Sequence, residues 1–306
     1  MTGPLPLPPP GPHGGDGARV AAALGLDPDD VLDLSASLNP FAPDVVALAR
    51  DHLGELRRYP DVEVAEEMLA STLGVDRKRV VLTAGGAAAI ALVAEHTGAG
   101  WVDEPDFGLY RRHLPVLDPA APRWRSDPHN PSGHLAGPGE EAGVWDEAFL
   151  PLAAGTWTRG RAGWAIGSLT KAFACPGLRL GYAIAPDGAD ADAVRARRPE
   201  WAVGGLAAAL LVDLLPRADP AGWTAALAAA RADLAATLVE RGWSPLPSDA
   251  PWVLVPGAAG LREGLARGGV VVRDCSSFGL VDHVRIAVPG PPGLERLDRA
   301  LRHLAG

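Results

Sequence analysis

The sequence predicts an α/β fold, with a large domain in which a mostly parallel sheet is sandwiched by helices and a smaller α+β C-terminal domain. Short β-branched runs alternate with segments whose apolar residues recur at helical spacing, and tight glycine turns separate them. Beyond about residue 217, long helical stretches precede a second group of strands. A chain of 306 residues can bury a core in each of two domains.

The large domain is expected over residues 45–217, after a flexible Pro-rich tail (1–12) and an N-terminal arm (13–44) that holds a short helix (18–24) and strand (31–34). Its expected helices are 47–56, 62–73, 87–95, 107–114 and 199–217. Its expected strands are 80–83, 100–102, 143–146, 163–166 and 180–184. Because strands and helices alternate, we expect helices on both faces of the sheet.

The small domain is expected over residues 218–306. Its expected helices are 220–241, 260–267 and 294–304, and its expected strands are 252–255, 270–273 and 284–288. No internal repeat is visible.

Composition indicates a cytoplasmic protein that binds neither nucleic acid nor a membrane. The net charge is −9, and the longest basic runs are the pairs Arg57–Arg58 and Arg197–Arg198, too short for a phosphate-binding face. Two cysteines give no disulfide framework, and neither has a metal-ligand neighbour, so no metal is expected. The start lacks the pattern of a signal peptide, and no stretch is long enough to span a membrane.

The most informative segment is Ser168-Leu169-Thr170-Lys171, followed eight residues later by Arg179. Lysine occurs elsewhere only at Lys78. The segment resembles the cofactor-lysine segment of fold-type-I pyridoxal-phosphate enzymes. Within them it looks closest to the threonine-phosphate decarboxylases of cobalamin biosynthesis and their histidinol-phosphate aminotransferase relatives. The resemblance extends from His13 to about Val288.

The resemblance implies pyridoxal 5'-phosphate bound covalently to Lys171, whose amine also moves protons at the substrate α-carbon. Ser168 and Arg179 would bind the cofactor phosphate. Ser168–Lys171 also fits the S-x-x-K motif of β-lactamases, but that family needs S-D-N and K-T-G as well. Here Ser248-Asp249-Ala250 departs from the first, and the second does not occur.

Three further residues match cofactor contacts. Asp146, at the end of an expected strand, would pair with the ring nitrogen. Asn130, in Asp127-Pro128-His129-Asn130-Pro131-Ser132-Gly133, would donate to the ring oxygen, although the relatives carry Asn where this chain has Asp127. Tyr110 would stack on the ring. Asp146 could instead cap a helix, and Tyr110 could be a core residue; the motif context favours the cofactor roles.

The phosphate loop of the relatives corresponds to Thr83–Ala89, which lacks their hydroxyl and Glu. Only the backbone amides of Gly86 and Ala87 remain to meet the phosphate. Arg58-Tyr59-Pro60 resembles the family segment whose Tyr reaches the cofactor phosphate of the partner subunit. The resemblance therefore implies a homodimer with shared active sites, in which Tyr59 is a cofactor contact.

Substrate contacts are implied at Arg285, which matches the strand arginine that binds the α-carboxylate, and at Asn39 near that carboxylate. His13, the amide of Gly14, and Arg273 would bind a substrate phosphate. These segments resemble the decarboxylase branch more than the aminotransferase branch. Arg285 could instead form a surface ion pair, and His13 could simply be solvated.

These residues lead to three hypotheses for a small, phosphorylated amino-acid substrate. The first is decarboxylation of threonine phosphate, and the alternative is transamination, as in histidinol-phosphate aminotransferases. A catalytically silent cofactor-binding protein is the third, because the phosphate loop is stripped. Spacing does not decide between loss of the carboxylate and loss of the proton at the α-carbon. The chain is also shorter than is usual in this family, chiefly between Leu114 and Trp124.

Overall fold

The computed structural model describes residues 6–305, and it consists of two compact units. The large unit comprises Phe41–Asn130 and Leu135–Thr224. The small unit comprises the described residues up to Pro40, the short segment Pro131–His134, and the chain from Ala225 onward.

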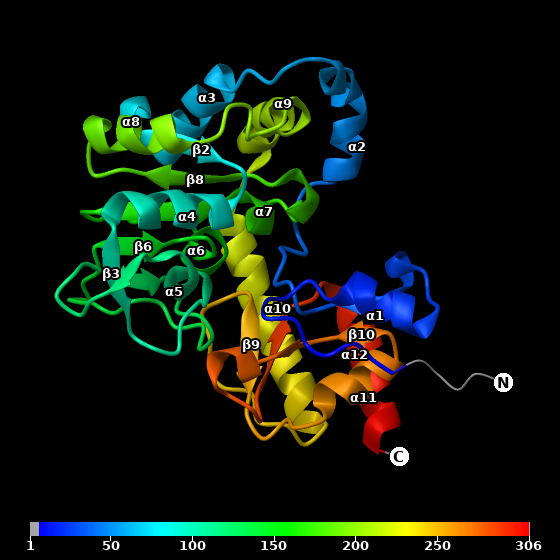
Figure 1. Cartoon of the computed structure of the whole chain (residues 1–306). Helices are drawn as coiled ribbons and strands as arrows, with labels where there is room; N and C mark the ends of the chain where they lie inside the picture. The colour runs from blue at the N-terminus through cyan, green and yellow to red at the C-terminus, as the bar shows by residue number, and fades with distance from the viewer. Residues whose placement is uncertain (1–5, 306) are drawn as a thin grey trace. The chain divides into compact units, whose positions relative to one another are not determined.

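A seven-stranded sheet forms the centre of the large unit, in the order β2-β8-β7-β6-β5-β3-β4 (Figure 1). Neighbours from β7 to β4 run parallel, whereas β8 is antiparallel to both β2 and β7. The mostly parallel sheet predicted from the sequence is therefore confirmed. The strands are β2 (Val80–Thr83), β3 (Ala99–Val102), β4 (Val116–Leu117), β5 (Arg123–Ser126), β6 (Val144–Asp146), β7 (Trp164–Ser168) and β8 (Gly181–Ile184).

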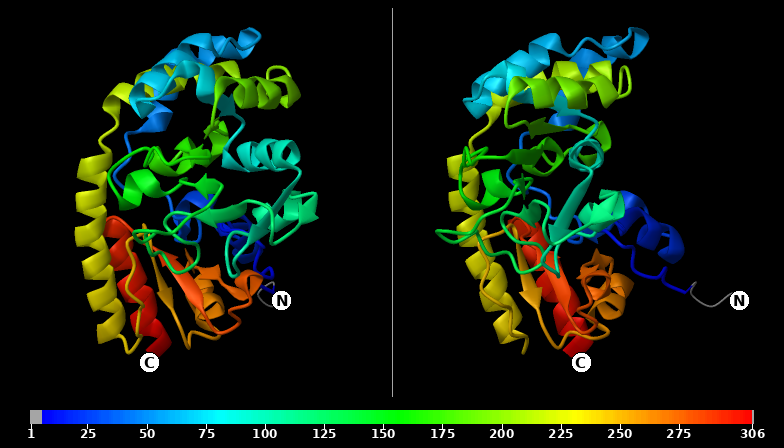
Figure 2. Two further views of the ribbon diagram at one scale, coloured as in Figure 1. Left: turned by 90° about the vertical axis from the view of Figure 1, so that its left-hand side faces the viewer. Right: turned by 60° about the vertical axis from the view of Figure 1, so that its left-hand side comes forward.

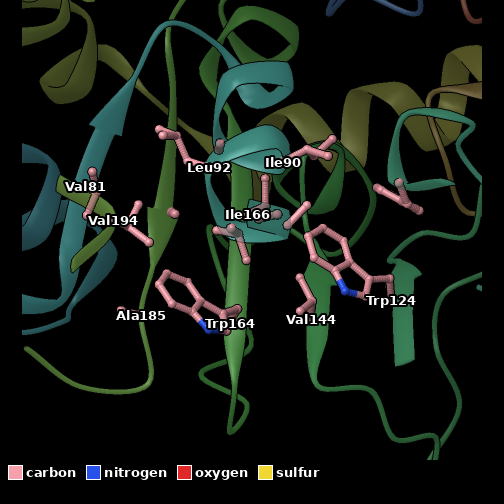
Figure 3. Close-up of a cluster of buried hydrophobic side chains, with 14 of the residues drawn as sticks. Val81, Ile90, Leu92, Trp124, Val144, Trp164, Ile166, Ala185 and Val194 are labelled. Atoms are coloured by element: carbon pink, nitrogen blue, oxygen red, sulfur yellow. The ribbon is translucent and has the colours of Figure 1, made fainter. Parts of the chain in front are cut away.

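Helices pack on this sheet and close its core. Their bounds are α2 (Val45–Ala49), α3 (Glu63–Leu73), α4 (Gly86–Thr97), α5 (Leu109–His113), α6 (Leu150–Ala153), α7 (Leu169–Ala172), α8 (Gly188–Arg197) and α9 (Gly205–Leu214), with the 3₁₀ segments η2 (Arg50–Arg57), η3 (Arg77–Arg79), η4 (Pro176–Leu178) and η5 (Leu215–Arg217). Figure 3 shows Ile90 of α4 and Val194 of α8 with the strand residues Val81, Trp124 and Ile166 in one apolar cluster. Burial of these side chains is the main stabilising contribution to the unit.

The core places the ends of three neighbouring strands side by side. Ser126 ends β5, Asp146 ends β6, and the two residues are paired in register. Ser168 ends β7, the next strand of the sheet. Carboxyl ends of parallel strands are where open α/β sheets bind ligands.

The small unit contains an antiparallel sheet in the order β11-β12-β9 and a parallel pair of β1 and β10. The helix α10 begins in the large unit and ends in the small one; in Figure 2 its C-terminal half runs beside α12, where Arg241 donates to Asp298 at 2.8 Å. The elements are α1 (Gly17–Leu24), η1 (Pro28–Asp30), β1 (Leu32–Asp33), α10 (Pro220–Glu240), β9 (Trp252–Val255), α11 (Leu261–Arg267), β10 (Val270–Val271), β11 (Arg273–Asp274), η6 (Ser276–Phe278), β12 (Val284–Ala287) and α12 (Pro291–Ala305).

Part of the predicted N-terminal tail is held against the small unit. The carbonyls of Pro8 and Pro9 accept hydrogen bonds from Arg262 and Arg19, and Leu7 packs against a small apolar cluster around Val20. Residues 1–5 of the predicted tail lie outside the described residues. Among residues 6–305, no helix is long and apolar enough to cross a membrane.

Five α-helices and β-strands of the large unit were not predicted, namely β4, β5, α6, α7 and α8. The strand β5 reads Arg-Trp-Arg-Ser, which carries two charges, yet Arg125 is buried because Glu140 pairs with it at 2.6 Å and the ring of Trp145 lies beside it. The helix α8 shows little apolar periodicity in its sequence, and only Ala191 and Val194 of it are buried. Conversely, the helix predicted over 199–217 begins only at Gly205.

Candidate active site

Asp146 lies at the centre of the candidate site. Its Oδ2 accepts a hydrogen bond from the hydroxyl of Tyr110 at 2.8 Å, and its Oδ1 accepts one from the backbone N–H of Ala148 at 3.0 Å. Burial raises the pKa of Asp146 to about 6, while the Tyr110 hydroxyl and the positive charge of Lys171 act in the opposite direction. The carboxylate is thus held in a fixed orientation, in surroundings that favour a cation beside it.

Lys171 lies on the short helix α7, directly after β7. It is partly exposed, and its Nζ lies 5.8 Å from the centre of the Phe149 ring. Because its charge lowers the pKa of Asp146, the two side chains belong to one electrostatic environment. Sequence reasoning brought these two residues together, and in the structure they are close enough to interact.

The residues expected around the cofactor phosphate gather at the N-terminus of α4. Gly85 has φ +88°, and a Cβ built on it would lie 2.5 Å from a terminal nitrogen of Arg179. A Cβ on Gly86, the first residue of the helix, would lie 3.4 Å from the Cβ of Ser168. The hydroxyls of Ser168 and Thr170 are hydrogen bonded at 2.8 Å.

This group fits a phosphate. The first N–H groups of a helix, including those of Gly86 and Ala87, have no carbonyl partner within the helix, and the helix dipole favours an anion there. Arg179, which is exposed, adds a charged donor, and Ser168 and Thr170 add hydroxyls. The glycines keep side chains out of this space. The loop lacks the hydroxyl and Glu of the relatives, but the hydroxyl of Thr170 lies beside Ser168 and Arg179 approaches Gly85 closely.

Asn130 and Asp127 lie on the loop after β5. The N–H of Asn130 donates to the Ser126 hydroxyl at 2.8 Å, which fixes the start of the loop. Asp127 is fully buried and forms ion pairs with Arg161 at 2.7 Å and Arg159 at 3.1 Å. The acidic residue that departs from the relatives therefore has its own cationic partners in this chain.

Tyr110 lies differently from the expected stacking residue. Its side chain is fully buried, its hydroxyl is committed to Asp146, and its ring packs against Trp124 and edge-on against Phe107. Phe107 is only partly buried. Phe107 therefore has accessible ring surface, whereas Tyr110 has none. Sequence reasoning missed Phe107, although it precedes Tyr110 by three residues.

Sequence reasoning also missed Asp106 and Ser126. The carboxylate of Asp106 is 3% exposed and accepts hydrogen bonds from the Ser126 hydroxyl at 2.5 Å, the Ser126 N–H at 3.0 Å and the Phe107 N–H at 2.7 Å. Burial raises the pKa of Asp106 to about 6. The only available signal was the run Asp103-Glu104-Pro105-Asp106 at the end of β3, and β5, which supplies Ser126, was not predicted.

In the small unit, two buried arginines face each other across neighbouring strands. Arg273 of β11 and Arg285 of β12 are register partners, and they are 6% and 3% exposed. Their guanidinium groups each lie 4.5 Å from the centre of an aromatic ring, Phe278 and Trp252 respectively. Burial lowers the pKa of Arg273 to about 10. Burial, and then repulsion from Arg273, lowers the pKa of Arg285 well below its usual value.

The other expected substrate residues, His13, Gly14 and Asn39, also belong to the small unit. Arg273 donates to the carbonyl of Pro12, which precedes His13. A Cβ on Gly14 would lie 1.9 Å from the Ser35 carbonyl oxygen, so only glycine permits this approach of the two segments. Asn39, a few residues further along, is 2% exposed. Tyr59, in the large unit, is 79% exposed and stacks on Trp201 with ring centres 4.6 Å apart.

The chain matches the family model for class I and II aminotransferases over residues 144–304. It is 28% identical to histidinol-phosphate aminotransferase from Symbiobacterium thermophilum over 94% of this chain and 93% of that protein. It is also 28% identical to threonine-phosphate decarboxylase from Salmonella typhimurium, over 64% of this chain and 68% of that one.

Solved structures agree with this family. Histidinol-phosphate aminotransferase from Sinorhizobium meliloti, solved in complex with pyridoxal 5'-phosphate, has a TM-score of 0.75 at 18% identity over 94% of this chain and 95% of that one. This likeness shows the fold, which is the fold-type-I architecture predicted from the motifs. The chain belongs to the class I and II aminotransferase family and is a pyridoxal-phosphate-dependent enzyme.

Proposed function

We propose that this enzyme is an aminotransferase acting on a phosphorylated amine or amino acid of the histidinol-phosphate kind. The observation that carries the proposal is the buried pair Arg273 and Arg285 in the small unit. Two desolvated guanidinium groups in adjacent strands repel each other, and an anion of charge −2, or two anionic groups, relieves that repulsion. A phosphorylated substrate and an acidic amino-group acceptor both meet this requirement.

The residues of the large unit would hold the cofactor. Ser168, Arg179 and the N-terminus of α4 would bind its phosphate, Asn130 its ring oxygen and Asp146 its ring nitrogen. When bound, pyridoxal phosphate withdraws electrons from the α-carbon of an amino acid. The amine of Lys171 would hold the cofactor and carry a proton to and from that carbon. Asp146, held by Tyr110, would keep the ring nitrogen charged.

Phe107 replaces Tyr110 in our proposal as the residue that packs on the cofactor ring. A stacking residue must offer a ring face, and Tyr110 has no exposed surface. Phe107 is partly buried and packs edge-on against Tyr110 at 5.7 Å between ring centres. Tyr110 would instead position Asp146 through its hydroxyl.

Decarboxylation of threonine phosphate is the second candidate. It was the leading hypothesis from the sequence, but more of the curated relatives are histidinol-phosphate aminotransferases, which favours transamination. The observation that keeps it in consideration is the Salmonella relative, a threonine-phosphate decarboxylase. A role in cobalamin biosynthesis would follow only from this second activity.

One experiment separates the candidates. The holoenzyme is supplied with histidinol phosphate and a 2-oxo acid, and separately with threonine phosphate, while amino-group transfer and CO2 release are measured. We expect amino-group transfer and no CO2. CO2 release from threonine phosphate without transfer would replace the proposal by the second candidate, and a cofactor-loaded protein inert in both assays would contradict both.

The variant Lys171→Ala serves as the inactive control in these assays. Arg285→Lys should raise the KM for the substrate at least tenfold, because a lysine cannot form the bidentate contact.

We also propose that the enzyme is a cytoplasmic homodimer. Support for the dimer comes from apolar side chains that the large unit exposes on α2, η2 and the adjoining loops, namely Val46, Leu53, Leu56, Tyr59 and Trp201. Exposed apolar side chains in such numbers are typical of an interface. Both cysteines are free thiols, as in proteins of a reducing compartment.

A further inference from the structure

Asp106 is a buried carboxylate of the large unit that the roles proposed above leave unused. It follows β3 and accepts two hydrogen bonds from Ser126, at the end of β5, and a third from the N–H of its neighbour Phe107. Ser126 is the register partner of Asp146. The two carboxylates are therefore attached to the ends of adjacent strands, and each lies in a site with little water.

A chain of hydrogen bonds links Asp106 to the cofactor residues. The Ser126 hydroxyl donates to Asp106 and accepts from the N–H of Asn130 at 2.8 Å. On the other side, Tyr110 donates to Asp146 at 2.8 Å, and the charge of Asp106 acts on both Tyr110 and Asp146. Loss of Asp106 would thus release the Ser126 hydroxyl and, with it, the start of the Asn130 loop.

We propose that Asp106 is a positioning residue of the cofactor site, which fixes the Asn130 loop through Ser126 and adds its negative charge to that of Asp146 beside the ring nitrogen. The inference rests on the proposed placement of the ring nitrogen at Asp146. A buried charge interacts over several ångströms far more strongly than an exposed one. Two buried carboxylates therefore hold a cationic ring more firmly than one does.

Other charged groups face this pair as well. Arg125 of β5 favours the ionised form of Asp106 and Lys171 of α7 that of Asp146, whereas the charge of Asp106 disfavours ionisation of Asp146. The backbone N–H of Asp106 donates to Glu104, and Tyr110 of α5 stays protonated because burial raises its pKa well above the usual range. The arrival of a cationic ring nitrogen adds a positive charge to this group, so proton binding at Asp106 must change when the cofactor binds.

The direct test is a carboxyl-carbon NMR titration of the wild-type enzyme, labelled in its aspartates, before and after loading with pyridoxal phosphate. We expect the titration midpoint of Asp106 to fall on loading by on the order of one pH unit, a tenfold loss of proton affinity. A midpoint of Asp106 that is unchanged or rises would overturn the inference.

A variant pair tests the same charge from the cofactor's side. The holoenzymes Asp106→Asn and Asp103→Asn lose one negative charge from the same segment, but the Asp103 side chain is 69% exposed. With cofactor labelled by ¹⁵N in its ring, we expect the nitrogen to lose its proton at a lower pH in Asp106→Asn than in Asp103→Asn. Identical behaviour of the two variants would contradict the role of Asp106. If Asp106→Asn fails to fold, the wild-type titration decides.

Failure of the proposed function would look different. Asp146→Asn should lower the pH at which the ring nitrogen loses its proton, whatever Asp106 does. If Asp146→Asn has no effect, the cofactor placement is wrong. If Asp146→Asn has an effect and Asp106→Asn has none, only the inference about Asp106 falls.

Discussion

At the scale of single residues, the large unit is distinguished by charged side chains that are buried. Asp127, where relatives carry Asn, is fully buried but lies 2.7 Å from Arg161 and 3.1 Å from Arg159. Arg161 also lies over the Trp145 ring at 3.8 Å. A buried carboxylate without a partner would be very costly, so the departure at Asp127 depends on these two arginines.

Asp127→Asn should therefore lower the free energy of unfolding by on the order of 3 kcal/mol, because it removes the anion that pairs with Arg159 and Arg161 and leaves Arg161 only Glu147 at 3.6 Å. The double variant Asp127→Asn/Arg161→Gln should lose less than the sum of the single losses, by about 1 kcal/mol or more. Urea denaturation of the apoenzyme measures both. A variant Asp127→Asn as stable as the wild type would show that the ion pairs contribute nothing.

Asp106 should make the stability of the apoenzyme depend on pH. Burial raises its pKa in the folded state to about 6, above its value in the unfolded chain, so its protonated form is the favoured one. The stabilisation that the protonated Asp106 side chain gives the folded state is therefore present below about pH 4 and is lost as the pH rises through 6. The free energy of unfolding of Asp106→Asn, measured relative to wild type, should therefore rise by about 1 to 3 kcal/mol between pH 4 and pH 7.5. Asp103→Asn, measured by the same denaturation series, should show no such trend.

At the scale of secondary-structure elements, the N-terminus of α4 is the most constrained point. Gly85 precedes the helix with φ +88°, and a Cβ on it would collide with Arg179. Gly98 follows the helix with φ +71°, and a Cβ on it would meet no atom within 4 Å. An alanine at either position strains the backbone, but only at Gly85 does it displace the expected phosphate ligand.

Gly85→Ala should thus weaken pyridoxal-phosphate binding by at least tenfold, while Gly98→Ala should leave it within about twofold of wild type. Both variants should lose roughly 1 kcal/mol or more of stability. Cofactor affinity is followed by the protein's change in absorbance and fluorescence on titration. Equal affinity in both variants would mean that Arg179 and the α4 N-terminus do not bind the phosphate.

The sequence predicted the longer apolar strands well, but it missed the short elements β4, α6 and α7 and the charged or polar elements β5 and α8. The strands β2 and β9 lie at the predicted residues because each is a purely apolar or β-branched run. The strand β5 was missed because charges in a strand signal exposure unless partners are known, and Glu140 and Trp145 come from elsewhere in the chain. The helix α8 was missed because its pattern is mostly polar and alanine-rich.

The candidate site follows the same rule. Motif spacing predicted Lys171, Asp146, Ser168 and Arg179 as site residues. The structure places Asp146 and Ser168 at the ends of β6 and β7, and Lys171 and Arg179 in the segment between β7 and β8. Motif spacing did not distinguish Phe107 from Tyr110, because both lie at the start of one short helix and only packing shows which ring is exposed. Asp106 was missed because its partner, Ser126, lies on the unpredicted β5.

At the scale of the whole molecule, the large unit exposes apolar side chains that packing within a single chain leaves largely uncovered. Trp201 is 58% exposed and stacks on Tyr59, and Leu56 is 69% exposed. In the proposed homodimer these side chains would be buried against the second copy, and Tyr59 would reach the partner's cofactor phosphate.

Leu56→Asp should weaken the dimer by at least tenfold, because it removes roughly 1.5 to 3 kcal/mol of apolar burial and adds a charge. Val281→Asp in the small unit, where the valine is 77% exposed, is the matched control and should dimerise as wild type does. Sedimentation velocity over a concentration series gives the dimer dissociation constants of both variants. A wild-type chain that stays monomeric at every concentration would remove the dimer from the account.

The central claim is that Lys171 holds the cofactor, and the chain offers a clean test because its only other lysine is Lys78. The loaded enzyme is reduced with borohydride, digested, and analysed by peptide mass spectrometry. The account predicts one added phosphopyridoxyl group per chain, on the peptide containing Lys171, and none after Lys171→Ala. Label on Lys78, or a holoenzyme whose lysines both remain unmodified, would contradict it.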